Sequence, residues 1–348
     1  MKKKVTIQDI ANELGLSRNT VSKAINNTDG LAEETRKLII EKAVEMGYKQ
    51  FSYVKAMADV DKLTSAAAAK HNGVIALFTS TYLPSNSHFA SLLLDKFQKE
   101  ISQLGFTLVT YIIQKDLIKA GTLPATFDRK NTRAVVCIEI FSKSYADLIC
   151  SLDLPVLFID GPCWPFGRSV HSDLLLMGNY TEIDQFIHDK AAQGLRKFGF
   201  IGDYTHCQSF NERYSAFRMA LVREKLEFNE KFVISPTDRD IETMRNMLRN
   251  LNEYPEVFIC VNDFNAIDAM MILKGKDSSL LKKVRFLGFD DSHESSIFTP
   301  SLSTVHIHTQ SMAFSAVQML MTRMQYPDME YRTVHVATDL ILRESTEF

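Results

Sequence analysis

The sequence predicts a small all-α helix-turn-helix unit at the N-terminus, followed by a larger α/β region built as two doubly wound subdomains. Two observations lead to this fold class. Amphipathic helical periodicity covers the first 50 residues, and from residue 73 onward short β-rich runs alternate with amphipathic helices. With 348 residues, 45% of them apolar, the chain is long enough for two or three compact units.

The first two predicted helices lie within residues 5–27. Thr6 can cap the first helix, and Gly15 ends it. Ser17 can cap the second helix, which places Val21 and Ala24 inward. One buried face of the first helix is formed by apolar residues three or four apart: Ile7, Ile10, Ala11 and Leu14. Two short helices around a glycine turn are typical of a helix-turn-helix, whose second helix enters the DNA major groove.

The outward residues of the second helix have the chemistry of a DNA contact. Arg18, Asn19 and Lys23 offer donors and an amide that can read base edges. Short hydroxyl side chains suited to phosphates complete the expected contacts: Thr6, Ser17, Thr20 and Ser22. The alternative is a polar, solvated face on an ordinary helical hairpin.

A third amphipathic helix is predicted over residues 33–48. Its expected core residues are Leu38, Ile39, Ala43 and Met46. With this helix included, residues 5–48 resemble the DNA-binding headpiece of the lactose/galactose repressor (LacI/GalR) family of bacterial transcription regulators. The matching positions are Thr6, Asp9, Ile10, Ala11, Gly15, Leu16, Ser17, Thr20, Val21, Ser22, Lys23, Thr35, Arg36, Gly47 and Tyr48.

Residues 51–72 are expected to form a hinge helix and linker. The resemblance implies that a side chain here enters the DNA minor groove, and alignment from Tyr48 assigns that role to Met57, with Lys55 as a basic neighbour. An ordinary apolar helical turn is the alternative. The family's usual Pro-Asn opening is replaced by Gln50 and Phe51, so the hinge geometry is not carried over.

The distribution of charge and the length of the apolar runs indicate which class of protein this is. The first 55 residues hold ten Lys and Arg against seven Asp and Glu, although the whole chain has a formal charge of −2. No apolar run reaches membrane-spanning length, and the N-terminus lacks the apolar core of a signal peptide. Five widely spaced cysteines show no paired Cys-x-x-Cys. These features predict a soluble, cytoplasmic protein with reduced thiols.

The remaining sequence alternates between strand and helix. Buried strands are predicted at 73–78, 106–113, 134–140, 155–160, 197–202, 232–235, 257–261 and 284–289. Helices are predicted at 88–104, 142–151, 176–194, 210–225, 239–251 and 264–273. Such alternation indicates parallel sheets covered on both faces, and about ten strands suggest two subdomains.

This region resembles the periplasmic-binding-protein-like effector domain of the same family, and the ending DLILRESTEF is similar to the family's close. The expected domains are a headpiece (1–50), a hinge and linker (51–72) and an effector-binding and dimerisation domain (73–348). An N-subdomain is expected at about 73–161 and 300–325, and a C-subdomain at about 165–292 and 328–348. Crossings between them are expected near 161–165, 290–300 and 325–330.

Polar residues at strand ends suggest a binding site. Asp160, Asn262 with Asp263, and Asp290 with Asp291 each follow a predicted strand, and Arg213 lies near a helix start. Carboxylates accept hydrogen bonds from hydroxyls, and an Arg fork donates them in a fixed plane, which suits a polyhydroxylated ligand. The resemblance implies that four of these residues line a sugar site: Asp160, Arg213, Asn262 and Asp290. Each alone is equally explained as a helix cap or a structural ion-pair partner.

The identity of the ligand stays open. The segment SPTDRDIETM has no aromatic residue where the family often has a stacking platform. Candidate substitutes are Trp164, Phe166, Phe89 and Phe264. The sequence also has no Gly-rich phosphate loop and no Gly-x-Ser-x-Gly elbow. His306 and His308 lack a third ligand, so neither an enzyme, a cofactor nor a metal site is expected.

These inferences predict a homodimeric, sequence-specific transcriptional regulator that binds double-stranded operator DNA. It is expected to be a repressor whose operator affinity responds to a sugar or sugar derivative. A corepressor-dependent regulator responding to a nucleobase or a phosphoprotein partner is the alternative. A transporter's solute-binding protein would need a secretion signal and no DNA-binding unit, and an α/β enzyme would need a catalytic motif.

Overall fold

The computed structural model describes residues 5–25, 31–46, 48, 72–80, 88–163, 171–237 and 240–348. The chain divides into two compact units, Met1–His71 and Asn72–Phe348, which are considered separately. Five residues with predicted roles, or their side chains, lie outside the described part: Lys55, Met57, Phe89, Trp164 and Phe166.

The first unit contains three helices, α1 (Ile7–Leu14), α2 (Arg18–Ile25) and α3 (Glu33–Glu45). Thr6 caps α1 as predicted, because its hydroxyl accepts from the Asp9 amide while the Asp9 carboxylate accepts from the Thr6 amide at 2.8 Å. The buried core of the unit is Ile10, Ala11, Val21, Ala24, Ile39 and Ala43. Leu38 is 52% exposed, so its predicted core position is wrong, whereas the predicted core residues Ile39 and Ala43 are fully buried.

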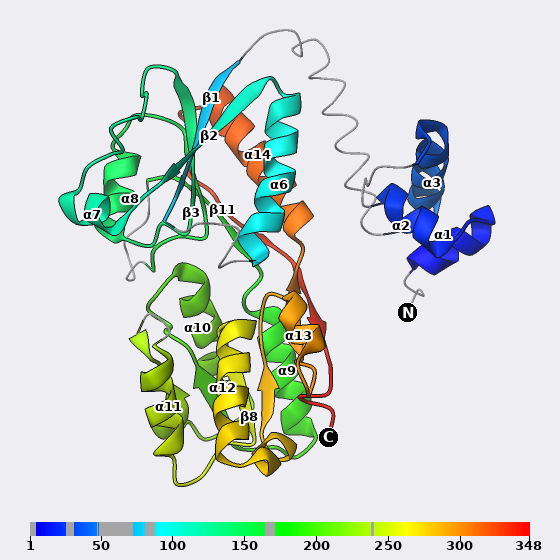
Figure 1. The fold of residues 1–348 in the computed structure, drawn as a ribbon, viewed down its shortest axis with the longest axis vertical. Helices are drawn as coiled ribbons and strands as arrows, with labels where there is room; N and C mark the ends of the chain where they lie inside the picture. Colours follow the sequence, from blue (N-terminus) through cyan, green and yellow to red (C-terminus); the bar gives the residue numbers. More distant parts are fainter. Residues whose placement is uncertain are drawn as a thin grey trace. The chain divides into compact units, whose positions relative to one another are not determined.

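The second unit contains a six-stranded parallel sheet in the order β11-β5-β4-β3-β1-β2. Its strands are β1 (Gly73–Thr79), β2 (Phe106–Ile112), β3 (Thr132–Ile138), β4 (Val156–Ile159), β5 (Asp173–Met177) and β11 (Thr333–Val336). Its helices are α6 (His88–Gln103), α7 (Lys115–Ala120), α8 (Lys143–Cys150) and α14 (Thr309–Gln325). We call this sheet with its helices the N-subdomain (Figure 1).

Both faces of the N-subdomain sheet are buried. Ile75 and Leu77 of β1 pack in one cluster with residues of α6 and α14, whereas Ala76 and Phe78 pack in another with residues of α8. Successive side chains of a strand point to opposite faces, so a sheet covered by helices on both sides needs a continuous apolar run. The run GVIALF therefore predicts this strand correctly.

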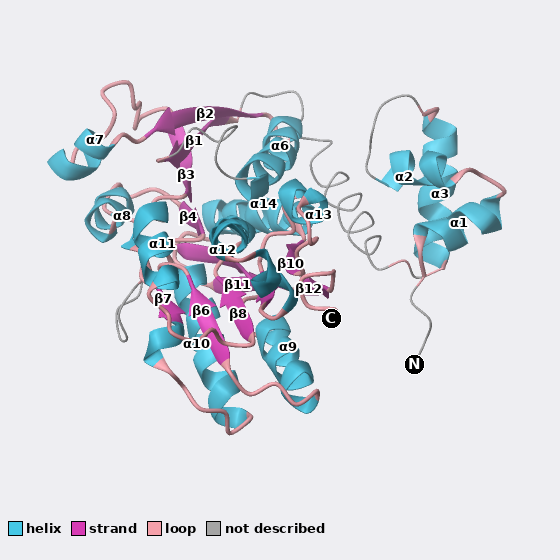
Figure 2. Ribbon diagram, turned by 60° about the horizontal axis from the view of Figure 1, so that its bottom comes forward, coloured by secondary structure: helices cyan, strands magenta, loops and turns pink. Residues whose placement is uncertain are grey.

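A second parallel sheet has four strands in the order β7-β6-β8-β9. Its strands are β6 (Phe198–Ile201), β7 (Val233–Ile234), β8 (Val257–Cys260) and β9 (Arg285–Leu287). Its helices are α9 (Thr181–Ala192), α10 (Gln208–Arg223), α11 (Ile241–Arg249), α12 (Asp263–Lys276), α13 (His293–Ile297) and the short 3-10 turns η1 (Glu230–Phe232) and η3 (Ser278–Lys282). We call this part the C-subdomain, and Figure 2 shows its strands between the helices.

The chain crosses between the two sheets three times. The crossings follow β5, β10 (Thr304–Ile307) and β11, and β10 pairs antiparallel with β12 (Thr338–Ile341). Isolated bridges join Leu287 to Ser303 and Asp290 to His306, which places β10 beside β9. The crossings therefore fall near 178–180, 308 and 337.

These crossings differ from the predicted ones for a local reason. Residues 173–177 read DLLLM, a short continuous apolar run, and form β5 beside β4. The helix predicted at 176–194 accordingly begins only at Thr181. Because β5 and β11 both pair within the N-subdomain sheet, that subdomain extends beyond its predicted limits at 161 and 325.

The predicted fold class is confirmed: a helix-turn-helix unit precedes an α/β unit with two parallel sheets. Among the described residues, no helix is both long and apolar enough to cross a membrane.

Candidate functional site

The second helix of the first unit presents a polar face. Arg18, Asn19 and Lys23 are exposed on α2, and Ser22 is half-buried. Ser17 caps α2, because its hydroxyl accepts from the Thr20 amide at 3.0 Å and lies 2.8 Å from the Thr20 hydroxyl. The predicted base-reading side chains therefore stand on a capped helix.

In the second unit, a buried arginine lies where strand ends of the two sheets meet. Arg213 of α10 is 1% exposed, and its Nη1 lies 3.8 Å from Oδ1 of Asp290, which follows β9. The guanidinium carbon sits 3.4 Å from the ring centroid of Phe289. This stacking fixes the plane of the guanidinium and leaves its edge for polar partners.

Asp160 follows β4 of the N-subdomain and caps a helix of the C-subdomain. Its carboxylate accepts from the Ser209 amide at 3.1 Å and from the Ser209 hydroxyl at 2.5 Å. The N-cap residue of α10, Cys207, makes no side-chain cap bond of its own. The carboxylate therefore satisfies donors at a helix end that would otherwise lack a partner, and it ties one subdomain to the other.

Three carboxylates and the guanidinium of Arg213 act on the carboxyl group of Asp290. Burial raises the pKa of Asp290 to about 8; Arg213 opposes this shift, whereas Asp263, Asp160 and Glu139 add to it. Burial is also the main reason that the pKa of Arg213 is lowered. We call Glu139, Asp160, Arg213, Asp263 and Asp290 the strand-end site.

Backbone strain is concentrated in the same place. Glu139, Asp160 and Asp291 have φ values of 59°, 54° and 54°, and Asp290 has a φ of 113°. These residues follow β3, β4 and β9. A left-handed conformation costs a non-glycine residue about 1–3 kcal/mol, and such strain is commonly found at functional sites.

Asn262 and Asp263 have different surroundings. The Asn262 side chain caps α12 by accepting from the Asn265 amide at 3.0 Å. Asp263 is fully buried, and its carboxylate accepts from the Ser292 amide at 2.7 Å and the Thr304 hydroxyl at 2.5 Å. Burial raises its pKa to about 6. Of the two residues, Asp263 is the one whose charge acts on Asp290.

Gly288 provides the space for the Asp263 carboxylate. A Cβ atom at this glycine would lie 2.2 Å from Asp263 Oδ1. Any larger residue would therefore displace the carboxylate or the first turn of α12 that carries it.

Sequence reasoning missed several residues of this site. Glu139 was placed inside the predicted strand 134–140, although β3 ends at Ile138. Ser209 and Glu212 belong to the helix that carries Arg213, and their partners come from distant segments. An acidic residue directly after a strand is the signal that could have identified Glu139.

An aromatic pair was also missed. Phe141, which follows β3, and His206, which precedes α10, have ring centroids 4.8 Å apart. The rings come from the two subdomains. The predicted alternative Phe264 is half-buried on α12.

The two histidines of STVHIHTQ have separate carboxylate partners. His306 Nδ1 lies 2.9 Å from Asp291, and His308 Nε2 lies 3.2 Å from Asp339. Within the described ranges, no group of three or more His, Cys, Asp or Glu side chains is arranged to hold a metal ion.

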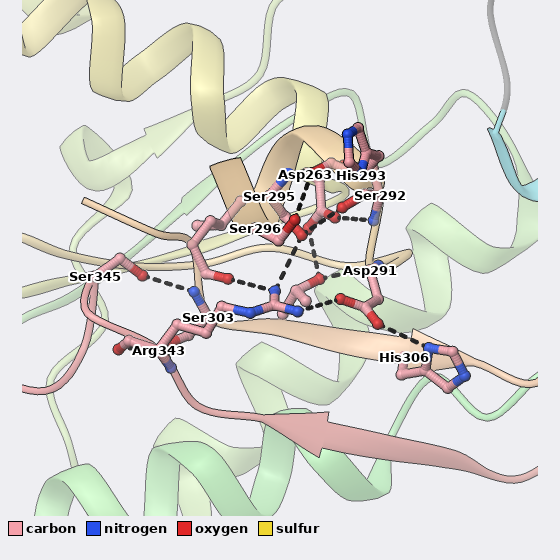
Figure 3. A network of polar contacts seen from close by, with 12 residues as sticks. Asp263, Asp291, Ser292, His293, Ser295, Ser296, Ser303, His306, Arg343 and Ser345 are labelled. Atoms are coloured by element: carbon pink, nitrogen blue, oxygen red, sulfur yellow. Dashed lines mark hydrogen bonds and ion pairs between the residues drawn. The ribbon is translucent and has the colours of Figure 1, made fainter. Parts of the chain in front are cut away.

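Residues of the C-terminal segment, Arg343 and Ser345, form hydrogen bonds with the segments beside the strand-end site (Figure 3). Arg343 donates to Asp291 at 2.6 Å, to Ser295 Oγ at 3.0 Å and to the Leu302 carbonyl at 2.8 Å. Ser345 Oγ accepts from the Ser303 amide at 2.9 Å. The ending RESTEF therefore holds β9, α13 and β10 together.

A cavity of the second unit lies elsewhere. It has a volume of about 680 Å³ and is lined by residues of η1, β7 and the end of α11, including Lys231 and Glu253. Ligands of parallel α/β sheets bind beyond the carboxyl ends of the strands. The cavity does not lie at such an edge, whereas the strand-end site does.

We predict that Asp290→Asn flattens the dependence of stability on pH. A carboxyl group whose pKa is raised on folding binds more protons in the folded state, so stability falls as pH rises from about 4 to 8. Asparagine removes this loss because it cannot ionise. Thermal melting between pH 4 and 8.5 measures the effect; equal slopes for the variant and the wild type would contradict it.

Comparison with known proteins identifies both units. A family model described as bacterial regulatory proteins, lacI family, matches residues 6–50, and one described as a periplasmic binding protein-like domain matches residues 189–346. The HTH-type transcriptional repressor PurR of Haemophilus influenzae (strain PittEE) is 25% identical over 98% of each chain. PurR of Actinobacillus pleuropneumoniae serotype 3 (strain JL03) is 24% identical, also over 98% of each chain.

Solved structures share the whole architecture. The lac repressor dimer bound to operator and the anti-inducer ONPF has a TM-score of 0.64 at 17% identity and covers 99% of each chain. The transcriptional regulator CelR–cellobiose complex has a TM-score of 0.66 at 17% identity and covers 98% of this chain and 100% of that one. The helix-turn-helix, the paired parallel sheets and these matches agree: the chain joins a DNA-binding domain of the lacI family of bacterial regulatory proteins to a periplasmic-binding-protein-like domain, the architecture of the LacI-family transcriptional regulators that it resembles.

Proposed function

We propose that this regulator is a cytoplasmic, homodimeric repressor whose affinity for operator DNA changes when a sugar-like effector binds at the strand-end site. The observation that carries the proposal is the convergence of Asp160 and Asp290, which follow strands of different subdomains, on Arg213 of α10. Carboxylate acceptors beside a stacked guanidinium suit the vicinal hydroxyls of a sugar.

The proposed mechanism is a population shift. An effector that contacts Asp160 on one subdomain and Arg213 on the other favours one arrangement of the two subdomains. When both subunits of a dimer change their subdomain arrangement in this way, the spacing of the two headpieces changes, and the affinity for operator DNA changes with it. Relatives support the repressor role, and solved neighbours described as complexes with cellobiose and with D-xylulofuranose support a sugar.

We expect Arg213→Lys to lose the effector response while the protein stays folded. Lysine keeps the buried charge, but it cannot donate in a fixed plane. Alanine is a poorer test because it would remove a large buried side chain together with its hydrogen bonds to Asn179 and to the Val261 carbonyl. Thermal shift against sugars, sugar phosphates, glycosides and nucleobases is the measurement; a ligand at a hundredfold its Kd stabilises the folded state by about 2.7 kcal/mol.

Exposed Arg249 of α11 allows a matched control, since Arg249→Lys makes the same substitution at an exposed position outside the strand-end site. A sugar that shifts the melting of the wild type and of Arg213→Lys equally would contradict the assignment. A response to nucleobases alone would favour the corepressor alternative.

For DNA binding, we predict that Lys23→Ala weakens operator binding by about 1–3 kcal/mol and relaxes the preference at one half-site position. Lys23 is exposed in the last turn of α2, on the helix proposed to read the major groove. Binding to operators obtained by selection from random DNA measures both effects.

Lys37→Ala is the control, because it removes an equal charge from α3. If both variants weaken binding to all sequences by the same factor, Lys23 acts only on phosphates and does not read a base. The remaining proposed DNA contacts are Thr6, Ser17, Arg18, Asn19, Thr20, Ser22, Lys55 and Met57.

A further inference from the structure

A chain of buried polar contacts joins the strand-end site to the crossings between subdomains. Oε2 of Glu212 in α10 lies 3.1 Å from Nε2 of His335 in β11 and accepts from Asn179 Nδ2 at 2.8 Å. Asn179 Oδ1 in turn accepts from Arg213 Nε at 2.9 Å. We call His335, Glu212, Asn179 and Arg213 the Glu212 chain.

The members of the Glu212 chain belong to both subdomains and to a crossing between them. His335 stands on a strand of the N-subdomain sheet, and Glu212 and Arg213 stand on a C-subdomain helix. Asn179, which is 1% exposed, lies in the crossing between β5 and α9. Any change in the angle between the subdomains must therefore stretch or rebuild these contacts.

The first and third crossings are also tied to each other. The Gly178 amide donates to the Val336 carbonyl at 2.7 Å, and the Thr338 hydroxyl donates to the Gly178 carbonyl at 3.0 Å and to Glu182 at 2.7 Å. The crossings therefore move as one element, with the His335–Glu212 contact directly beside it.

We infer that Glu212 and His335 are positioning residues: their contact sets the orientation of Arg213 and couples the arrangement of the subdomains to pH in the neutral range. The inference rests on the proposed function only in treating Arg213 as an effector residue. The coupling itself needs no effector.

Of the two side chains, Glu212 is the more buried, and its charge stays constant at neutral pH. Its side chain is 8% exposed, against 39% for His335. Burial raises the pKa of Glu212, but hydrogen bonds from His335, Asn179 and Gln208 outweigh this and leave it lowered. Glu212 is therefore ionised at neutral pH, and the imidazole is the group that titrates.

Protonated His335 forms an ion pair with Glu212, whereas neutral His335 keeps at most a hydrogen bond. The hydrogen bond to Glu212 is the main reason that the pKa of His335 is raised above its usual 6.5. Because the pKa of His335 is higher in the folded state than in the unfolded state, the ion pair contributes its full stability below about pH 6.5. This stability is lost as the pH rises through the pKa of His335 in the folded state.

Other charged or titratable groups stand on the elements around His335. They are Arg213 of α10, Tyr180 before α9, Glu182 of α9, Asp173 at the start of β5, and Arg323 and Arg332, which bond Asp173. Glu212 is the partner that shifts the pKa of His335. Asp290 titrates near pH 8, so the two events are separable by variants.

The test follows the distance between subdomains in the full chain without ligand. Donor and acceptor fluorophores on unnatural amino acids at exposed Lys119 and Asn250 report energy transfer between pH 5.5 and 8.5, and NMR titration of ¹³C-labelled histidine reports His335. We expect the efficiency of energy transfer to change with pH, with the same midpoint as the NMR titration of His335, above pH 6.5. His335→Gln and Glu212→Gln should abolish this change, and Glu212→Gln should lower the pKa of His335, because the hydrogen bond and the charge that raise it are lost.

His188→Gln provides a matched control. His188 pairs with Glu224 at 2.9 Å and also has a raised pKa, but both residues lie within the C-subdomain. This variant should keep the full pH response. A flat profile in the wild type, or an unchanged response in His335→Gln, would overturn the inference. An effector screen without hits would count against the proposed function alone.

Discussion

Replacing Arg323 by alanine is expected to destabilise the second unit by about 3–5 kcal/mol. Arg323 of α14 makes a two-point contact with Asp173 of β5, at 3.1 Å from Nε and 3.0 Å from Nη2, and both side chains are almost fully buried. Its remaining donors reach the carbonyls of Pro327, Met329 and Glu330. Alanine would leave the buried Asp173 carboxylate with only the more distant cation of Arg332, at 3.7 Å, and would remove one donor from each of the three carbonyls.

Arg223→Ala is the matched control. Arg223 pairs with Asp184 at 2.6 Å, but its side chain is 58% exposed, and exposed ion pairs contribute about 0–1 kcal/mol. Urea unfolding of both variants at pH 7 measures the difference. A cost for Arg323→Ala no greater than that for Arg223→Ala would show that the burial of this pair does not stabilise the fold.

The Arg323–Asp173 pair also shows what the sequence could not predict. The two residues are 150 positions apart, and neither belongs to a local motif. Continuous apolar runs such as GVIALF predict buried strands because their two faces are covered alike. Which sheet receives a strand depends on pairing, and DLLLM carries no signal that assigns β5 to the N-subdomain.

The site was predictable to a similar degree. Asp160 and Asp290 could be selected as candidates because parallel strands end at one edge of a sheet, and a polar residue after a strand lies at that edge. Arg213, inside a helix, was selected through the family resemblance. The cap that Asp160 provides to α10 and the contact between Glu212 and His335 were not predictable, because each joins residues of different subdomains. Local chemistry indicates a site, whereas the coupling between its parts depends on the tertiary structure.

Arg343→Ala is expected to cost about 3 kcal/mol at pH 7 and less at pH 3. Arg343 donates to a carboxylate, a hydroxyl and a carbonyl, and hydrogen bonds to charged groups contribute about 1.5–3 kcal/mol each. Burial raises the pKa of Asp291, but hydrogen bonds from His306 and Arg343 outweigh it and leave the pKa below its usual value. Stability from a lowered carboxyl pKa is present above about pH 4 and is lost as pH falls through the folded value.

The cost of Arg343→Ala should therefore shrink in acid, since protonated Asp291 no longer needs the cation. Urea unfolding at pH 7 and pH 3 measures this, with the removal of exposed Arg249 at the end of α11, Arg249→Ala, as the control that changes charge alone. A cost independent of pH would mean that Arg343 acts through Ser295 and Leu302 only. A destabilisation that is smaller at pH 3 would mean that the Arg343–Asp291 ion pair stabilises the fold. The C-terminal segment would then hold the strained backbone of Asp290 and Asp291, from which Asp290 faces Arg213.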